Sequence, residues 1–212
     1  FTNYVNKKNS GPKGEIKDLK KRIAALESGD EASDDPQAAI AECRDKIAEA
    51  EARIFKPIIG CEMYVARRTM AHREGKQDQS GYHLVVLAKN EKGYHNLIKL
   101  VSRAWTKGYY MRPRTDRSEL EKYHEGLIVC SACIAGEVPR ALINDQLDKA
   151  EEAIQWYKNL FGDDYYLELQ RHEVTNPTIH ANREAFPLEQ KANAQMLELA
   201  KKYHIKVICT ND

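Results

Sequence analysis

From residue 55 to the C-terminus, short apolar runs alternate with segments of helical spacing, and this alternation permits few folds. Apolar residues recur every three or four positions in three segments: 91–105, 147–161 and 188–203. The remaining apolar runs are expected to be strands: 56–66, 82–88, 127–131, 165–170 and 206–210. Repeated strand–helix units with near-continuous apolar strands predict parallel strands covered by helices. We therefore expect an α/β fold, and the alternation alone leaves a barrel and a doubly wound sheet both open.

Residues 11–53 differ in composition, being rich in Lys, Glu and Ala and lacking aromatic residues. Apolar residues recur at helical spacing along two stretches: Ile16, Leu19, Ile23 and Leu26, then Ile40, Cys43, Ile47, Ala50 and Ile54. Between the stretches, Asp35 suits an N-cap and Pro36 the first helical position. We expect an antiparallel helical hairpin inserted into a domain formed by residues 1–10 and 54–212. A surface insertion without chemistry is favoured over a docking site for a partner.

The charge balance excludes one class of function. The 33 Lys and Arg residues nearly cancel the 32 Asp and Glu residues, so the surface as a whole should not attract nucleic acid. No apolar run approaches the roughly 18 residues of a membrane span, and the N-terminus has no signal-peptide pattern. The five cysteines are irregularly spaced, which favours reduced thiols. We expect a cytoplasmic protein without a membrane partner.

Ionisable and thiol groups interrupt or end the apolar strands. Glu62 lies within the first strand and His83 begins the second, whereas Cys133, His172 and Asp212 follow later strands. Burying an unpaired carboxylate costs several kcal/mol, so such groups usually have a partner or a cation. The carboxyl ends of strands in α/β folds gather functional groups, and these side chains bind zinc, manganese or iron. The pattern therefore predicts a metal site.

Each of these residues also has a structural interpretation. A histidine beside a strand is more often hydrogen-bonded than a metal ligand, Glu62 could pair with an arginine, and Cys133 could be a small apolar residue. Cys130 and Cys133 match a dithiol pattern, but the chain has no second pair of this spacing. Strand alternation would turn the two thiols to opposite faces, whereas it places Glu168 and His172 on one face.

Several strand segments, taken in order, resemble the PHP (polymerase and histidinol phosphatase) domain of bacterial C-family replicative DNA polymerases. The resemblance rests on 59–64 (IGCEMY), 83–90 (HLVVLAKN), 93–97 (GYHNL), 109–114 (YYMRPR), 130–137 (CSACIAGE), 166–172 (YLELQRH) and 210–212 (TND). In 130–137, Ala132 replaces a glycine of the family pattern. The similarity covers residues 55–212 and, more weakly, 1–10, and it does not include the helical hairpin.

The resemblance implies a fold and a set of ligands. The fold is a distorted (βα)7 TIM-like barrel of the PHP type, whose mouth holds up to three divalent metal ions. Glu62 matches a bridging carboxylate, His83 a histidine ligand, Cys133 a thiol ligand and Asp212 the aspartate of the last Asp-x-His motif. His172 lies in a segment that contributes a histidine in some members. The opening His-x-His strand, an Asp-His and the final His are absent, so we expect a barrel truncated at both ends with an incomplete site.

The resemblance also implies alternative functions. The parent protein is expected to be a DNA-directed DNA polymerase, a nucleotidyltransferase that binds DNA and other replicase subunits, and this fragment alone is expected to be inactive. The PHP segment itself is either a metal-dependent phosphoesterase, acting in proofreading or pyrophosphate hydrolysis, or a scaffold that docks a proofreading exonuclease subunit. A free-standing histidinol-phosphatase-like enzyme is a third alternative, and segments 93–97 and 133–137 argue against it.

One basic stretch could contact DNA directly. Residues 99–117 combine aromatic side chains with basic ones, among which Arg103, Lys107, Arg112 and Arg114 are candidate nucleic-acid contacts. Basic and aromatic residues together can bind phosphates and stack on bases. The favoured alternative is a solvated basic helix face, followed by a loop whose aromatic residues pack on the domain.

Overall fold

The computed structural model describes residues 2–173 and 185–211. The chain forms two compact units, Phe1–Ile58 and Ile59–Asp212. No helix among the described residues is both long enough and apolar enough to cross a membrane.

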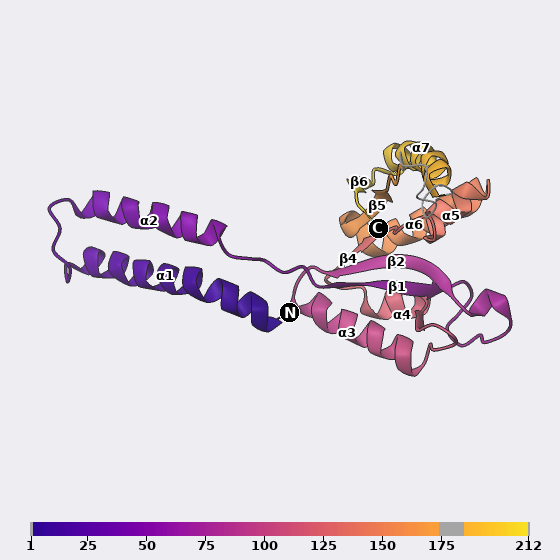
Figure 1. The fold of residues 1–212 in the computed structure, drawn as a ribbon, viewed down its shortest axis with the longest axis horizontal. Helices are drawn as coiled ribbons and strands as arrows, with labels where there is room; N and C mark the ends of the chain where they lie inside the picture. Colours follow the sequence, from indigo (N-terminus) through magenta and orange to yellow (C-terminus); the bar gives the residue numbers. More distant parts are fainter. Residues whose placement is uncertain (1, 174–184, 212) are drawn as a thin grey trace. The chain divides into compact units, whose positions relative to one another are not determined.

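The first unit is the expected helical hairpin, made of α1 (Thr2–Ser28) and α2 (Pro36–Ala52) (Figure 1). Asp35 caps α2 by accepting a hydrogen bond from the Ala38 amide at 3.0 Å, as predicted. The apolar seams face each other, because Leu26 of α1 and Ile40, Cys43 and Ala50 of α2 are all buried.

Helix α1 begins nine residues earlier than predicted and includes residues 2–10. The Asn9 side-chain amide donates a hydrogen bond to the Phe55 carbonyl and accepts one from the Phe55 amide, both at 2.8 Å. These bonds join α1 to the segment that leaves α2. Residues 2–10 therefore lie in the same compact unit as the hairpin, and their assignment to the PHP domain stays a prediction.

The second unit contains a six-stranded sheet in the order β3-β1-β2-β4-β5-β6. The strands are β1 (Gly60–Ala66), β2 (Gly81–Ala88), β3 (Arg114–Thr115), β4 (Leu127–Cys130), β5 (Tyr165–Leu169) and β6 (Lys206–Cys209). Four of the five predicted strands begin within one residue of the observed start, and the first was predicted to begin four residues before the observed start of β1. The sheet is open over the described residues, so the PHP-type fold is present without a closed barrel.

The expectation that all strands are parallel is wrong. Strands β4, β5 and β6 are parallel and β1 pairs in parallel with β3, but β2 is antiparallel to both β1 and β4. Between β1 and β2, residues 67–80 contain only the short 3-10 helix η1 (Lys76–Asp78). A parallel neighbour requires a longer crossover, usually a helix, whereas an antiparallel neighbour does not.

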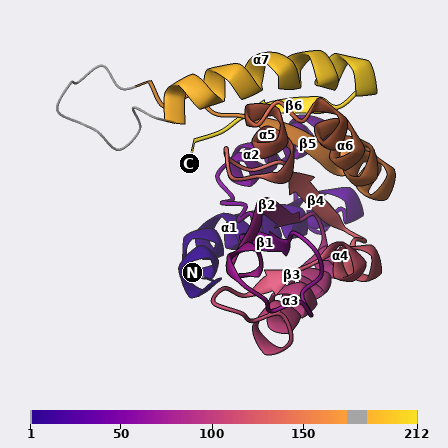
Figure 2. The same cartoon turned by 90° about the vertical axis from the view of Figure 1, so that its right-hand side faces the viewer.

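Among the described residues of this unit, the helices that accompany the sheet are α3 (Glu91–Thr106), α4 (Arg117–Tyr123), α5 (Glu137–Ile143), α6 (Leu147–Phe161) and α7 (Ala185–Tyr203). Helix α3 contacts β1 to β4, while α6 and α7 accompany β4, β5 and β6 (Figure 2). Side-chain caps begin two of them, since Asn90 accepts from the Gly93 amide at 2.9 Å and Asp116 from the Glu119 amide at 3.1 Å. The core between helices and sheet is fully closed to solvent at Val86, Leu100, Val129, Ile154 and Leu167.

Candidate metal centre

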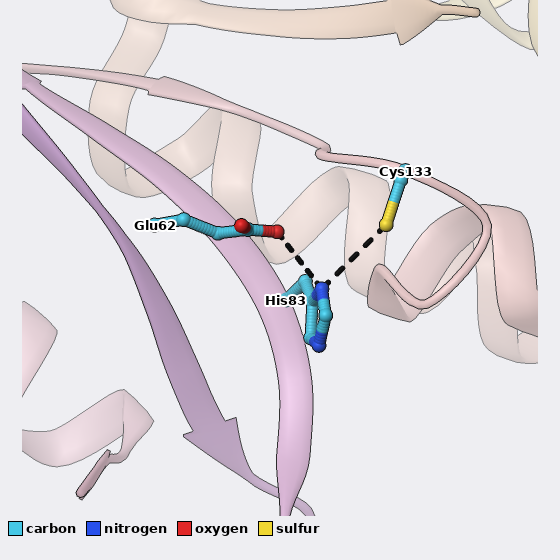
Figure 3. Close-up of side chains that lie close together, drawn as sticks. All are labelled: Glu62, His83 and Cys133. Atoms are coloured by element: carbon cyan, nitrogen blue, oxygen red, sulfur yellow. Dashed lines mark hydrogen bonds and ion pairs between the residues drawn. The ribbon is translucent and has the colours of Figure 1, made fainter. Parts of the chain in front are cut away.

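Three of the five predicted ligands meet beside the start of β2. Glu62 and Tyr64 lie on the same face of β1, and the β1–β2 register places Tyr64 opposite His83. The Glu62 Oε1 atom lies 2.8 Å from His83 Nδ1, and Cys133 Sγ lies 3.5 Å from the same nitrogen (Figure 3). Among the described residues, each of the three has a potential ligand atom within 4.8 Å of those of the other two.

Antiparallel pairing explains why His83 and Cys133 meet. Because β2 runs against β4, the first residues of β2 lie at the edge where β4 ends and the Cys133 loop begins. The His83 amide donates to the Ala135 carbonyl at 3.1 Å, and the Gly136 amide donates to the Cys133 carbonyl at 2.8 Å. A Cβ atom at Gly136 would lie 2.0 Å from the Ser131 carbonyl oxygen, so this tight turn requires glycine.

The buried Glu168 side chain organises the Cys133 loop. Its carboxylate accepts hydrogen bonds from the Ala132 amide at 2.5 Å and from the Thr210 hydroxyl at 2.9 Å, and its own amide donates to Ser131 Oγ at 2.8 Å. These bonds connect β5, the loop after β4 and the end of β6. The sequence placed Glu168 on the same face as His172 but did not identify it as a positioning residue.

Ala132 occupies the left-handed region, with a φ angle of 60°. This conformation is strained for alanine and free for glycine. The family pattern inferred from the sequence has glycine here, and the structure supplies the reason. The Cys133 loop therefore carries local backbone strain in this chain.

His172 lies outside the three-residue cluster. Its Nδ1 atom contacts Glu189 Oε1 at 2.5 Å, and its amide donates to Glu189 Oε2 at 2.8 Å. Glu189 is buried on α7, 17 residues further along the chain, and nothing in the local sequence pattern indicates this partner. Asp212 lies outside the described residues, so its role as a ligand stays a prediction.

The donor set of the cluster fits a divalent transition metal. One carboxylate oxygen, one imidazole nitrogen and one thiol sulfur form a mixed set of the kind that binds zinc or iron. The side chains are accessible, with 46% of Glu62 and 27% of His83 exposed, which leaves space for further ligands. By contrast, burial raises the pKa of the Cys130 thiol to about 12. Cys130 therefore stays protonated at neutral pH, and it is not part of the cluster.

The basic stretch divides into structural and exposed residues. Arg114 is completely buried, and its guanidinium donates to the carbonyls of Gly108, His72 and Met70 at 3.0–3.1 Å. This placement leaves no part of Arg114 at the surface, so its prediction as a DNA contact is wrong. Arg103 is partly buried against Glu119, to which it donates at 2.9 Å.

Lys107 and Arg112 are exposed, and so are two aromatic residues of the same stretch. Trp105 and Tyr109 are 58% and 48% exposed, with stacked rings whose centroids lie 5.7 Å apart. Trp105 belongs to α3 and Tyr109 to the loop that follows it, so the expectation that the aromatic residues of the loop pack on the domain is not met by Tyr109.

The sequence of the chain is similar to a known protein family. The family model of the PHP domain matches residues 21–172. The chain belongs to the PHP-domain family, as the sequence predicted.

Its relatives identify the branch of that family. The chain is 48% identical over 134 residues to DNA polymerase III subunit alpha of Borreliella burgdorferi, an alignment that covers 62% of this chain and 12% of the relative. It is 38% identical over 164 residues to the same subunit of Aquifex aeolicus, covering 74% of this chain and 13% of the relative. The Thermus aquaticus subunit is 39% identical over 166 residues, covering 77% of this chain and 13% of the relative. The chain therefore spans about an eighth of the length of these relatives.

Proposed function

We propose that this chain is the PHP segment of a replicative DNA polymerase alpha subunit and that Glu62, His83 and Cys133 bind a divalent metal ion: zinc, manganese or iron. The convergence of Glu62 Oε1 and Cys133 Sγ on His83 Nδ1 carries this proposal. His172 and Asp212 are proposed as ligands of further ions in the intact domain. The parent protein would synthesise DNA in the cytoplasm, together with other replicase subunits that include a proofreading exonuclease.

The chemistry proposed for the site is phosphoester or pyrophosphate hydrolysis. A bound divalent ion would lower the pKa of a coordinated water and neutralise charge on a phosphoryl oxygen. The protein side chains have orienting roles. The Tyr64 ring packs edge-on against the His83 ring at 5.0 Å, which limits rotation of the imidazole. Glu168 holds the loop that carries Cys133, through the Ala132 amide.

Metal content of the purified full chain tests the ligand assignment. We expect bound zinc, manganese or iron by elemental analysis, with loss in Glu62→Gln and Cys133→Ser. Cys209→Ser and Glu91→Gln are matched controls, because both side chains are exposed and lie outside the cluster. A folded wild-type chain that retains no metal after incubation with each ion would refute the proposal. Hydrolysis of pyrophosphate or single-stranded DNA by the metal-loaded whole polymerase then tests catalysis, because this fragment alone is expected to be inactive.

A scaffold without catalysis is the second candidate function. The observation in its favour is that Glu62 and His83 already contact each other at 2.8 Å, so they can form a structural ion pair without a metal. In that case Glu62→Gln would lower the free energy of unfolding without changing metal content. Binding of the exonuclease subunit would persist in the variants that abolish metal binding.

Contact with DNA is proposed for the part of the basic stretch that reaches the surface, which includes the partly buried Arg103 and the exposed Lys107 and Arg112. The candidates are Arg103, Lys107 and Arg112, next to the stacked pair Trp105 and Tyr109. Aromatic stacking on bases and ionic contacts to phosphates act together in single-strand binding. Replacing Lys107 and Arg112 with Ala in the whole polymerase should weaken DNA binding and reduce its salt dependence. Unchanged affinity across salt concentrations would rule this contact out.

A further inference from the structure

A second candidate site lies in a cavity of about 330 Å3 between the end of β1, the start of β2 and helices α4, α5 and α6. Its charged lining residues are Arg67, Arg117, Arg140, Lys149, Glu137 and Glu152. Its volume falls at the lower end of the roughly 300–1,000 Å3 typical of small-molecule pockets. Tyr82 also lines the cavity and precedes His83 on β2. Neighbouring strand residues point to opposite faces, so the cavity and the candidate metal centre lie on opposite sides of β2.

One of the four cationic side chains, Arg117, already forms ion pairs within the protein. Arg117 donates to Glu137 Oε1 at 2.9 Å and lies 3.7 Å from Glu152 Oε1. The second oxygen of Glu137 accepts from the Tyr157 hydroxyl at 3.1 Å. The guanidinium of Arg117 lies 4.8 Å from the centre of the Trp156 ring. Arg117 and Glu137 thus form a fixed pair in the wall of the cavity.

The other three cationic side chains, Arg67, Arg140 and Lys149, differ from Arg117 in this respect. Arg67 lies over the Tyr82 ring at 5.5 Å, whereas Arg140 and Lys149 are exposed. Among the residues that the structure describes, no carboxylate forms an ion pair with any of these three side chains. Four cations against two carboxylates leave an excess of two positive charges around one concave space. The like charges around the cavity repel one another, and a bound anion would relieve this repulsion.

We propose that this cavity binds a small molecule that carries linked phosphate groups. Arginine matches phosphate oxygens with paired N–H donors, and lysine adds a point charge. The three uncommitted cations come from three separate parts of the chain, so they can contact more than one phosphate group. The concave shape admits a small anion more readily than a duplex, whose phosphates lie on a convex surface. Glu152, with 74% of its side chain exposed, is the group that opposes binding.

Calorimetric titration of the full chain with inorganic pyrophosphate and tripolyphosphate, in the presence of a metal chelator, tests this site. We expect Arg140→Gln/Lys149→Gln to raise the Kd about tenfold or more, equivalent to about 1.4 kcal/mol. The matched control Lys92→Gln/Lys201→Gln removes the same charge from exposed positions on α3 and α7 and should leave the Kd unchanged. Glu152→Gln should lower the Kd. The metal-site variant Cys133→Ser should bind as the wild type does.

Absence of binding by the wild type, equal weakening in the control variant, or weakening by Glu152→Gln would each overturn the proposal. A single-stranded oligonucleotide serves as the second titrant. If it binds in a manner that depends on Arg140 and Lys149 while pyrophosphate does not, the ligand is a nucleic-acid backbone and the small-molecule proposal is wrong. Loss of pyrophosphate binding in Cys133→Ser alone would assign the phosphate to the metal centre instead.

Discussion

Replacing Arg114 with Met tests whether this residue stabilises the fold or contacts DNA. The guanidinium is completely buried and donates to three main-chain carbonyls, those of Met70, His72 and Gly108. Burial lowers the pKa of the Arg114 guanidinium, but an arginine stays protonated in proteins. The variant therefore removes three charge-assisted hydrogen bonds and leaves their acceptors without a donor.

The size of the effect follows from these bonds. Hydrogen bonds to charged groups contribute about 1.5–3 kcal/mol each, and the lower value applies because the buried guanidinium also loses its hydration. Three bonds then contribute about 4–5 kcal/mol, of which burial of the apolar Met side chain restores roughly 1 kcal/mol. We expect Arg114→Met to lose about 3–4 kcal/mol of unfolding free energy. With a urea m-value of about 2 kcal/mol/M, the midpoint falls by about 1.5–2 M.

Urea unfolding followed by circular dichroism measures this loss. Arg112→Met is the matched control, because Arg112 is exposed two residues away, and its effect should lie within about 0.5 kcal/mol. An Arg114→Met protein with a wild-type midpoint and weaker DNA binding would refute the structural role and restore the original DNA prediction.

Four further substitutions have expected signs. Ala132→Gly should raise the unfolding free energy by about 1 kcal/mol, because it relieves the left-handed backbone at φ 60°, whereas Ala141→Gly within α5 should lower it by a similar amount; urea midpoints check both. Glu168→Gln should weaken metal binding about 10–100-fold by loosening the Cys133 loop, and a metal titration that shows wild-type affinity would contradict this. Hydrogen bonding to Arg103 lowers the pKa of Glu119 below its ordinary value of 4.5. This pair therefore stabilises the fold fully above pH 4.5, and the stabilisation is lost as the pH falls through the lowered pKa. The difference in unfolding free energy between wild type and Glu119→Gln should shrink in acid, and a difference that stays constant with pH would contradict this.

Local patterns in the sequence were sufficient for most of the secondary structure. Helical spacing predicted α6 at its observed bounds, Leu147–Phe161, and the Asp35 cap of α2 is confirmed. These features depend on residues a few positions apart, so the sequence contains the necessary information. Glu62, His83 and Cys133 were identified for a similar reason, since polar groups in apolar strands need a partner. Their assembly into one cluster of possible ligand atoms is seen in the structure.

Contacts between distant segments were decided only by the tertiary structure. The antiparallel direction of β2 depends on a connection without a crossover helix, and this direction brings His83 to Cys133. A charged residue in a basic stretch looks exposed in the sequence, yet Arg114 is buried because carbonyls as far as 44 residues away accept its hydrogen bonds. The pairing of His172 with Glu189 likewise needs α7 to pack beside the end of β5. The periodicity of the sequence determines which face of a helix or strand a side chain occupies. The residues that contact this side chain depend on how distant segments pack together in the tertiary structure.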